Sequence, residues 1–337
     1  MTIKEIARLA GVSPSTVSMV LNKKPGIGAE TREKVMEIIE KKGYNPKSQG
    51  TKAKGNIRFV KYKHEGLLVE RNGDFITRVI DGVEDEARKL GFNLSITNAT
   101  SNSFEDIIES INAEDIDGII FLGTEFDSEK FQLLQGLNAP IVVLDNQFKY
   151  KDYDAVVMDN EDGVYLAVEH LKSLGHTQIG HLKSALSVDN FKARDTGFKA
   201  AMTHLGIGYN KAYTFELTPN VEESYSMMTE YLKNAKSLPT AFFADNDIIA
   251  IGAIRALKQA DIRVPEDISV VGFDDLAIGK VIDPPLTTIK ILKKKMGQLA
   301  VLRLIEKLNG ASDETLKILV GARLVEREST AKPAKKE

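Results

Sequence analysis

Residues 3–22 read IKEIARLAGVSPSTVSMVLN, and their spacing predicts two short helices joined by a tight turn. Thr2 opens the capping pattern Thr-x-x-Glu before the first helix, and Gly11 ends that helix. Ser13 is placed to cap the second helix, with Pro14 as its first residue, where a missing N–H costs nothing. This arrangement is typical of a helix-turn-helix, whose second helix enters the major groove of DNA.

A third helix is expected over residues 30–42, with Val35, Ile38 and Ile39 facing inward and Gly43 as its stop. The segment that follows, NPKSQGTKAKGN at 45–56, is polar, basic and broken by glycine, so it reads as a linker. On spacing alone, a three-helix bundle with no role in DNA binding is the alternative.

The charge distribution separates the chain into two parts. Residues 1–60 carry 12 Lys and Arg against 5 Glu, whereas the remaining 277 residues carry 33 basic and 43 acidic side chains. A basic head on an acidic body is expected where one end of a protein meets a polyanion, although a solvated basic surface is the alternative.

From Ile57 onward, short apolar runs alternate with helical stretches such as 77–90, 163–174 and 247–259. The runs are IRFV, FNLSIT, DGIIFLG, APIVVLD, DAVVMD, QIGHL, TAFFAD and ISVVGFD. This alternation predicts an α/β fold with parallel sheets covered on both faces. About 270 residues is more than one such sheet needs, so two lobes are expected. The end of the chain, from Thr330, is predicted to be disordered.

Composition excludes several classes of protein. The 337 residues contain no cysteine, so a disulfide scaffold, a thiolate metal site and a cysteine nucleophile are ruled out. Apolar runs are too short to span a membrane, and the N-terminus has no apolar segment of the kind that directs secretion. His170, His176 and His181 lack metal-ligand spacing, and no glycine-rich phosphate loop or Gly-x-Ser-x-Gly occurs. We therefore expect neither an enzyme nor a cofactor.

Polar side chains end several of the predicted strands, among them Asp145, Asp159, Asn246 and Asp274. In α/β sheets, ligands bind beyond the carboxyl ends of strands, where carboxylates and amides can accept hydrogen bonds from a polyol. Arg194 can donate two such bonds. For any one of these residues, capping of the next helix is the alternative, as for Asn246 before IIAIGAIRAL.

The identities of the residues at 2–46 indicate a protein family more narrowly than the spacing of their helices does. IKEIARLAGVSPSTVSMVLN and ETREKVMEIIEKKGYNP resemble the DNA-binding headpiece of the LacI/GalR family of bacterial repressors from Thr2 to Pro46. The resemblance implies base reading by Pro14, Ser15 and Met19. It implies phosphate contacts from Thr2, Ser13, Thr16, Ser18, Asn22, Thr31 and Tyr44.

Two departures from the family pattern bear on DNA recognition. Family members commonly carry Arg or His where this chain has Met19, which cannot bond guanine, so weaker guanine reading is expected there. They usually have a hinge helix with a Leu wedge, whereas this chain has Ala53 between two glycines. Lys47, Lys52 and Lys54 remain able to contact phosphates, and a flexible tether is the alternative to a hinge.

The body resembles the effector-binding core of the same family in segments such as VVLDN, RDTGFKAAM, PTAFFADNDIIAIGAI and VPEDISVVGFDD. The resemblance implies two Rossmann-like lobes of the periplasmic-binding-protein type, joined by three crossovers near Asp159, Thr288 and Val320. By position, the implied effector contacts are Phe75, Asp145, Asn190, Arg194, Asn246 and Asp274. Where relatives place polar or aromatic pocket residues, this chain has Met158, Ile291 and Lys293.

These observations predict a headpiece at 1–46, a linker at 47–56, a two-lobed core at 57–330 and a disordered tail at 331–337. The expected function is that of a cytoplasmic repressor, which binds a pseudo-palindromic DNA operator as a homodimer under the control of a small effector. A sugar is the family's usual effector, and a purine or other metabolite is the alternative. From other classes, a solute-binding protein fits the body alone, and a dehydrogenase or kinase would need the missing phosphate loop. Whether the effector releases or promotes DNA binding stays open.

Overall fold

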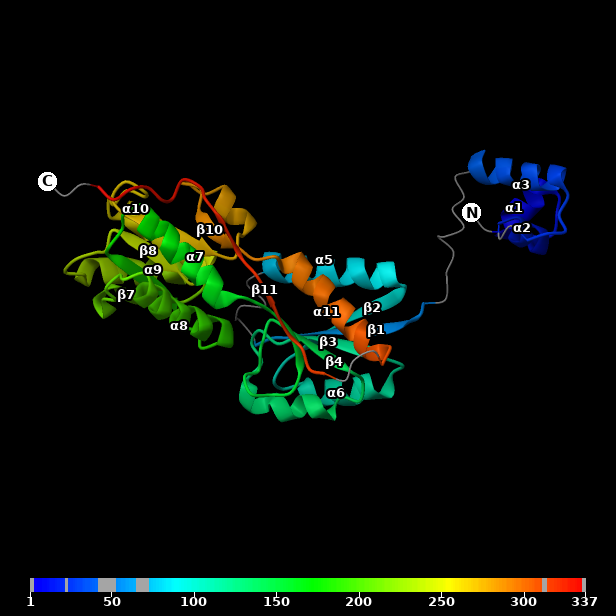
Figure 1. The fold of residues 1–337 in the computed structure, drawn as a ribbon, viewed down its shortest axis with the longest axis horizontal. Coiled ribbons are helices and arrows are strands. Elements are labelled where there is room, and N and C mark those ends of the chain that lie inside the picture. The colour runs from blue at the N-terminus through cyan, green and yellow to red at the C-terminus, as the bar shows by residue number, and fades with distance from the viewer. Residues whose placement is uncertain (1–2, 22–23, 42–52, 65–72, 311–313, 335–337) are drawn as a thin grey trace. The chain divides into compact units, whose positions relative to one another are not determined.

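The computed structural model describes residues 3–21, 24–41, 53–64, 73–310 and 314–334 (Figure 1). The chain forms two compact units, Met1–Ala53 and Lys54–Glu337. Thr2, Asn22, Tyr44 and Lys47, and most of the predicted linker, lie outside the described residues.

The first unit is a bundle of α1 (Ile3–Ala10), α2 (Pro14–Leu21) and α3 (Ala29–Lys41). Their apolar residues recur at helical spacing and meet in one small core. That core consists of Ile6, Ala7, Ala10, Val17, Val20, Val35 and Ile39. Gly11, with φ of +71°, makes the turn between the first two helices in a backbone conformation that favours glycine.

Lobe 1 of the second unit is built on a sheet of parallel strands in the order β11-β5-β4-β3-β1-β2. Its strands are β1 (Gly55–Tyr62), β2 (Phe92–Ala99), β3 (Gly118–Leu122), β4 (Ile141–Leu144), β5 (Asp154–Met158) and β11 (Lys317–Val320).

Lobe 2 repeats this arrangement in the order β12-β10-β9-β8-β6-β7, parallel except for the antiparallel pair of β10 and β12. Its strands are β6 (Ile179–Ser184), β7 (Thr214–Leu217), β8 (Ala241–Ala244), β9 (Ser269–Phe273), β10 (Thr287–Lys290) and β12 (Arg323–Val325). Both lobes are doubly wound sheets, so the expected α/β class and two-lobed core are confirmed.

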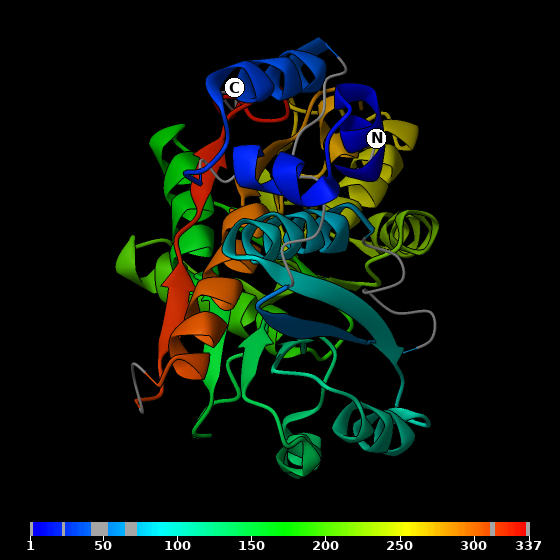
Figure 2. The same cartoon turned by 90° about the vertical axis from the view of Figure 1, so that its right-hand side faces the viewer.

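Helices cover both faces of each sheet (Figures 1 and 2). In lobe 1 these are α5 (Gly73–Leu90) and α11 (Lys293–Leu308) on one face and α6 (Phe104–Ala113) and the 3-10 helix η2 (Ser128–Gly136) on the other. In lobe 2 they are α7 (Asn160–Ser173) and α8 (Asp189–His204) on one face and α9 (Val221–Asn234) and α10 (Asp247–Gln259) on the other. Short 3-10 turns complete lobe 2 at η3 (Lys211–Tyr213) and η4 (Ala277–Lys280).

Along each strand, successive side chains point to opposite faces of the sheet, so the hydrophobic core is divided between the two faces. On β3, Ile120 and Leu122 point to α5 and α11, whereas Ile119 and Phe121 point to α6. All five residues of this strand are buried. Strands covered on both faces are apolar throughout, which is why they read as continuous runs in the sequence.

The helices α5 and α11 cross with their backbones in contact. A Cβ at Gly82 of α5 would lie 2.0 Å from the carbonyl oxygen of Lys294, and one at Gly297 of α11 would lie 2.2 Å from that of Val79. Only glycine therefore fits at these two positions, and α11 packs closely against α5.

The chain passes between the lobes three times in the described residues. It crosses at Asp159 between β5 and α7, at Ile291 and Leu292 between β10 and α11, and at Gly321 and Ala322 between β11 and β12. These points lie within a few residues of those expected from the family resemblance.

The structure corrects the predicted start of the disordered tail. Thr330 lies 3.0 Å from His170 through its hydroxyl, and Ala331 accepts a hydrogen bond from Ser269. These bonds hold the chain against lobe 2 at positions where the sequence shows only small and polar residues. Among the described residues, no helix has the length and apolar character needed to cross a membrane.

Candidate functional site

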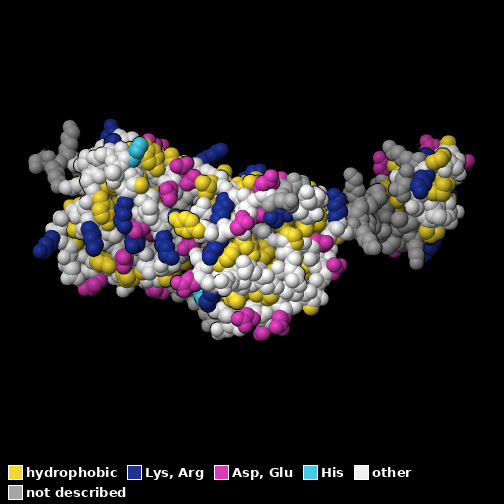
Figure 3. All heavy atoms as spheres, turned by 60° about the horizontal axis from the view of Figure 1, so that its bottom comes forward, with side chains coloured by type: hydrophobic (Ala, Val, Ile, Leu, Met, Phe, Trp, Pro, Cys, Tyr) yellow, Lys and Arg dark blue, Asp and Glu magenta, His cyan; other side chains and the backbone are white. Residues whose placement is uncertain are grey.

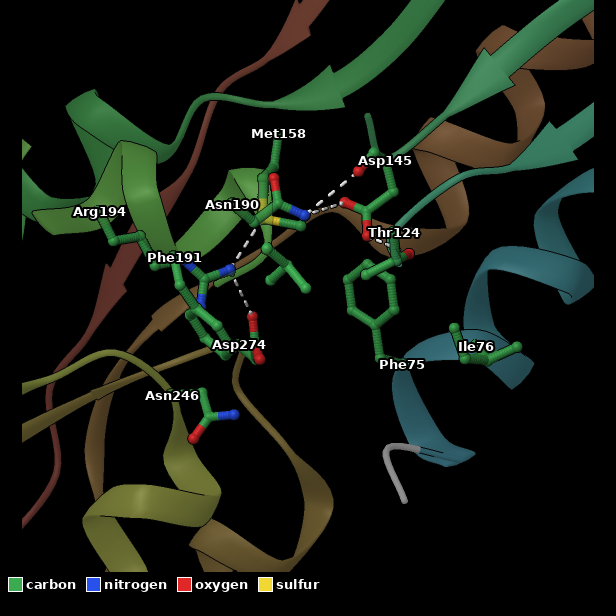
Figure 4. Close-up of a pocket in the computed structure, with 11 residues that line it drawn as sticks. Phe75, Ile76, Thr124, Asp145, Met158, Asn190, Phe191, Arg194, Asn246 and Asp274 are labelled. Carbon is green, nitrogen blue, oxygen red and sulfur yellow. Dashed lines mark hydrogen bonds and ion pairs between the residues drawn. The ribbon is translucent and has the colours of Figure 1, made fainter. Parts of the chain in front are cut away.

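A cavity lies between the two lobes, at the carboxyl ends of the strands of both sheets (Figure 4). It holds about 400 Å³ of space, counted with its open mouth. Its walls are Phe75, Ile76, Thr124, Asp145, Met158, Val188, Asn190, Phe191, Arg194, Asn246 and Asp274. In doubly wound sheets, this edge is where ligands bind.

Arg194 of α8 is the buried cation of the cavity. Its Nη2 lies 3.3 Å from the carboxylate of Asp274, its Nε donates to Asn160 over 2.8 Å, and its Nη1 donates to the carbonyl of Asp245. The guanidinium also stacks on the ring of Phe273, 3.8 Å from its centroid. These contacts fix the plane of the guanidinium.

Asp145 follows β4 and accepts hydrogen bonds from both lobes. Thr124 of lobe 1 donates its hydroxyl over 2.6 Å, and Asn190 of lobe 2 donates its amide over 3.1 Å. Burial raises the pKa of Asp145 to about 6, against the opposing effects of Thr124 and of the Arg194 charge. The carboxylate is therefore ionised at neutral pH but close to its titration range.

Asp274 and Asp275 follow β9 in backbone conformations that are rare for residues other than glycine. Their φ angles are +108° and +48°. Asp247 of α10 holds Leu276, the residue after Asp275, by accepting a hydrogen bond of 2.7 Å from its N–H. Asp247 also accepts a hydrogen bond from the hydroxyl of Thr288 on β10. Strained backbone that is fixed by its surroundings is common at binding sites.

Asp247 is itself an unusual carboxyl group, because it is fully buried. Burial raises its pKa to about 8, against the opposing hydrogen bonds of Thr288 and Leu276. At neutral pH, Asp247 is therefore mostly uncharged, which lowers the cost of placing a carboxyl group in this core.

The three histidines singled out in the sequence lie in lobe 2. His181 is buried, stacks on Phe198 and Phe243, and lies 2.7 Å from the carboxylate of Asp245. His170 contacts Thr330, and His176 contacts the carbonyl of Ala331 over 2.9 Å. Burial lowers the pKa of His170 and of His176. In the described part of the chain, no group of three potential ligands could hold a metal ion.

All six residues expected to contact an effector line this one cavity. Asn246 also caps α10 by accepting the N–H of Ile249 over 2.9 Å, so the capping alternative applies to it as well. Of the three departures from the family pattern, Met158 lines the cavity and lies 3.2 Å from Nη2 of Arg194 through its sulfur. Ile291 and Lys293 do not line it.

Sequence reasoning missed four of the wall residues, namely Ile76, Thr124, Val188 and Phe191. Thr124 follows β3 by two residues, so the strand-end rule that found Asp145 could have found it too. The other three are apolar and carry no signal that separates a cavity wall from a core position.

In the headpiece, the N-terminus of α2 is exposed at Pro14 and Ser15, while Met19 is half-buried. Ser13 caps this helix by accepting the N–H of Thr16 over 3.1 Å. Thr16, Ser18 and Thr31 are half-buried, and Ala53 is exposed at the boundary of the described chain.

Arg32 of α3 was not predicted to have a role. It donates to the carbonyl of Lys24 over 2.8 Å and to that of Val20 over 3.5 Å. Through these bonds it holds the end of α2, the expected recognition helix, against α3. Its acceptors are backbone carbonyls, which a sequence does not reveal.

Comparison with known families gives two matches. "Bacterial regulatory proteins, lacI family" matches residues 2–47, and "Periplasmic binding protein-like domain" matches residues 168–330.

Individual proteins match over almost the whole chain. The HTH-type transcriptional repressor PurR of Pasteurella multocida is 34% identical over 97% of this chain and 98% of its own. The lac repressor dimer bound to operator and the anti-inducer ONPF is 27% identical, with a TM-score of 0.73 over 98% of this chain and 99% of its own. A LacI family transcriptional regulator from Enterococcus faecium with bound ribose is 28% identical, with a TM-score of 0.69 over 82% of this chain and 99% of its own.

Proposed function

Because the chain belongs to the lacI family of bacterial regulatory proteins, we propose that a small polar ring compound, a sugar in the first instance, binds between its lobes and sets its affinity for operator DNA. The chain is a DNA-binding transcriptional repressor with an effector-binding core.

One observation carries the effector proposal: both lobes contribute polar side chains to one cavity at the ends of their strands. Arg194 offers a donor plane, Asp145 and Asp274 offer acceptors, and Phe75 offers an apolar face (Figure 4). A sugar ring presents hydroxyls at its edge and C–H groups on its face, so it complements both kinds of wall. The regulator with bound ribose is a similar protein that holds such a ligand.

A purine is the second candidate. Phe75 and Phe191 both line the cavity, and an aromatic ring can stack on a flat heterocycle. The two carboxylates can accept hydrogen bonds from its N–H groups.

For the headpiece, we propose that the exposed start of α2 reads bases through Pro14, Ser15 and Met19. The phosphate contacts proposed are Thr2, Ser13, Thr16, Ser18, Asn22, Thr31, Tyr44 and Lys47. Ala53 is too small to wedge between base pairs, so we propose that DNA bends less than it does around a Leu wedge. Bending measured by gel mobility should increase in A53L, and a sharp bend that is already present in the unchanged protein would overturn this.

We further propose a cytoplasmic homodimer that binds two half-sites of a pseudo-palindromic operator and carries no catalytic activity. The lac repressor, a similar protein, binds its operator as a dimer. Two half-sites demand two recognition helices related by a two-fold axis.

The test combines two measurements on the full-length protein. Sugars, sugar phosphates and nucleobases are first screened by thermal shift, since a ligand at 100 times its dissociation constant stabilises the protein by about 2.7 kcal/mol. The compounds found are then added to a gel shift with a palindromic operator, which also shows whether they release or promote binding. Loss of the thermal shift in R194K supports the cavity, whereas an undiminished shift contradicts it.

A further inference from the structure

A second, strongly basic groove lies where β10 passes into α11, outside the cavity between the lobes. Its lining includes side chains from α5, η4, β10 and α11, and it shares none of the walls of that cavity. The groove holds about 1030 Å³, counted with its open mouth. Its cationic side chains are Arg78, Lys280, Lys290, Lys293, Lys294 and Lys295, and its acidic ones are Asp74 and Asp275.

Half of these cations already have partners. Lys293 is buried and lies 3.3 Å from the carboxylate of Asp74. Arg78 lies 3.8 Å from the same residue, and Lys294 contacts Asp85 over 2.5 Å. The second acid of the groove, Asp275, is held by Arg327.

The other three cations have no acidic partner among the described residues. Lys280, Lys290 and Lys295 are exposed, and each comes from a different element around the groove. On the face of the core shown in Figure 3, basic and acidic side chains are interspersed, and the core as a whole is acidic. Three unpaired lysines converging on one hollow therefore form a local concentration of positive charge.

The start of α11 adds to this charge. Lys293, Lys294 and Lys295 occupy its first turn, which contains no acidic residue, and no side chain caps it. Cations at a helix N-terminus oppose the helix dipole, and the first-turn N–H groups beyond that of Lys293, which donates to the carbonyl of Ile291, need an acceptor. Lysines in the first turn of α11 therefore cost stability, and residues that cost stability are expected at functional sites.

We propose that this groove is a second binding site, for a small molecule that carries a phosphate or diphosphate group. A multivalent anion neutralises Lys280, Lys290 and Lys295 together, and it reverses the unfavourable charge at the start of α11. The open groove has room for an organic group attached to that anion. A length of duplex DNA is disfavoured as the occupant, because the surrounding core carries a net negative charge.

The groove adjoins the effector cavity through neighbouring residues of the chain. Asp74 precedes Phe75, and Asp275 follows Asp274, with one of each pair in the groove and the other in the cavity. Lys293 contacts Asp74 of lobe 1 and lies 3.5 Å from the carbonyl of Asp275 in lobe 2. The proposed anion therefore binds beside the contacts that join the two lobes.

The experiment is a calorimetric titration of the full-length protein with inorganic pyrophosphate in phosphate-free buffer of physiological salt concentration. We expect the unchanged protein to bind, and K280A/K290A/K295A to bind about tenfold more weakly or worse. The matched control, K130A/K211A/K236A, removes three exposed lysines elsewhere in the core and should bind as the unchanged protein does. The charge-conserving K280R/K290R/K295R should also retain binding.

Three results would overturn the proposal. They are no binding of pyrophosphate by the unchanged protein, equal loss in the two alanine variants, and a groove variant that weakens only the binding of random-sequence duplex DNA. Because all three groove lysines are exposed, the unfolding midpoint should not fall in any variant, and a thermal scan of each variant checks this. None of these lysines lines the effector cavity, so the outcome is independent of the effector proposal.

Discussion

The side-chain amide of Asn190, on α8 of lobe 2, donates a hydrogen bond of 3.1 Å to the carboxylate of Asp145, which follows β4 of lobe 1. A second bond of 3.2 Å joins the same amide to the Asp145 carbonyl. The two lobes are thus linked across the cavity by groups that a polar effector would also seek. An effector that replaces or strengthens this link would bind one relative arrangement of the lobes better than another, and control of DNA binding requires such a difference in affinity.

Removal of the Asp145 charge should change the response of stability to acid. The pKa of this carboxyl is about 6 in the folded protein, against 3.8 for an ordinary exposed aspartate, so its ionisation opposes folding. The protonated form of Asp145 therefore contributes to the free energy of unfolding. This contribution is fully present below about pH 3.8 and is lost as the pH rises to about 6, which lowers the free energy of unfolding by about 3 kcal/mol. In D145N this loss should disappear, which urea unfolding at a series of pH values measures. Parallel pH profiles for the two proteins would refute the assignment.

Asp247 should act in the same direction over a higher range. Its pKa of about 8 means that the folded protein retains a proton that the unfolded chain has released. Stability should therefore fall by about 2 kcal/mol between pH 6 and pH 8, and D247N should lack this fall. Because Asp145 has finished most of its titration by then, D145N serves as the control. An identical decline in D247N and the unchanged protein would contradict the prediction.

Replacement of Arg194 should abolish the effector response and leave the headpiece intact. R194K retains the charge but loses the planar fork and its stacking on Phe273. We expect about tenfold or greater loss of effector affinity, measured by calorimetry, with unchanged operator binding in the absence of effector. The matched control is R255K, which alters an exposed arginine paired with Glu222. Full effector affinity in R194K would exclude Arg194 as a contact.

An alanine at the α5–α11 crossing should destabilise the core. The Cβ of G82A would clash with the backbone of Lys294, and backbone cannot move aside as a flexible side chain can. We expect a loss of about 2–3 kcal/mol in the free energy of unfolding. G73A, in the same helix with no atom near its added Cβ, is the control and should stay within about 0.5 kcal/mol. Equal stability of the two variants would show that the helices can separate at no cost.

Operator specificity should shift when Met19 is replaced. Methionine offers only apolar contact to a base edge, whereas arginine can bond guanine O6 and N7 together. M19R should therefore gain about 1–3 kcal/mol of preference for guanine at the matching operator position. Fluorescence anisotropy with operators substituted at that base measures the preference. If the unchanged protein already prefers guanine strongly and M19A loses that preference, our interpretation of Met19 is wrong.

The sequence predicted the elements that are strongly patterned. The helix expected at 247–259 has those bounds in the structure, and the apolar runs form strands that are largely buried, except for β2 at the edge of its sheet. The strands β7, β10, β11 and β12 were not predicted, because TFEL, TTIK, KILV and RLV are only three or four residues long. Their strand conformation depends on pairing with neighbours far away in the chain, which no local pattern records.

The cavity was predicted in part for a similar reason. Asp145, Asn246 and Asp274 could be found because they follow strands, and the family resemblance supplied Phe75, Asn190 and Arg194. The contacts that fix Arg194 involve a carbonyl, a thioether and an aromatic face, and these groups look ordinary in a sequence. The raised pKa of Asp247 likewise follows from burial, which only the folded chain defines.

Each lobe is built from separate segments of the chain, and this arrangement sets the order in which a nascent chain can complete the two lobes. The sheet of lobe 1 begins with Gly55, but its edge strand β11 ends at Val320, after every strand of lobe 2 except β12 has been synthesised. A ribosome must therefore release nearly the entire polypeptide before either sheet has its last strand. Translation that stops between Met158 and Lys317 leaves β5 as an open edge, a template for pairing with another chain. Because the chain passes back and forth between the lobes, neither lobe can be completed during synthesis without the other.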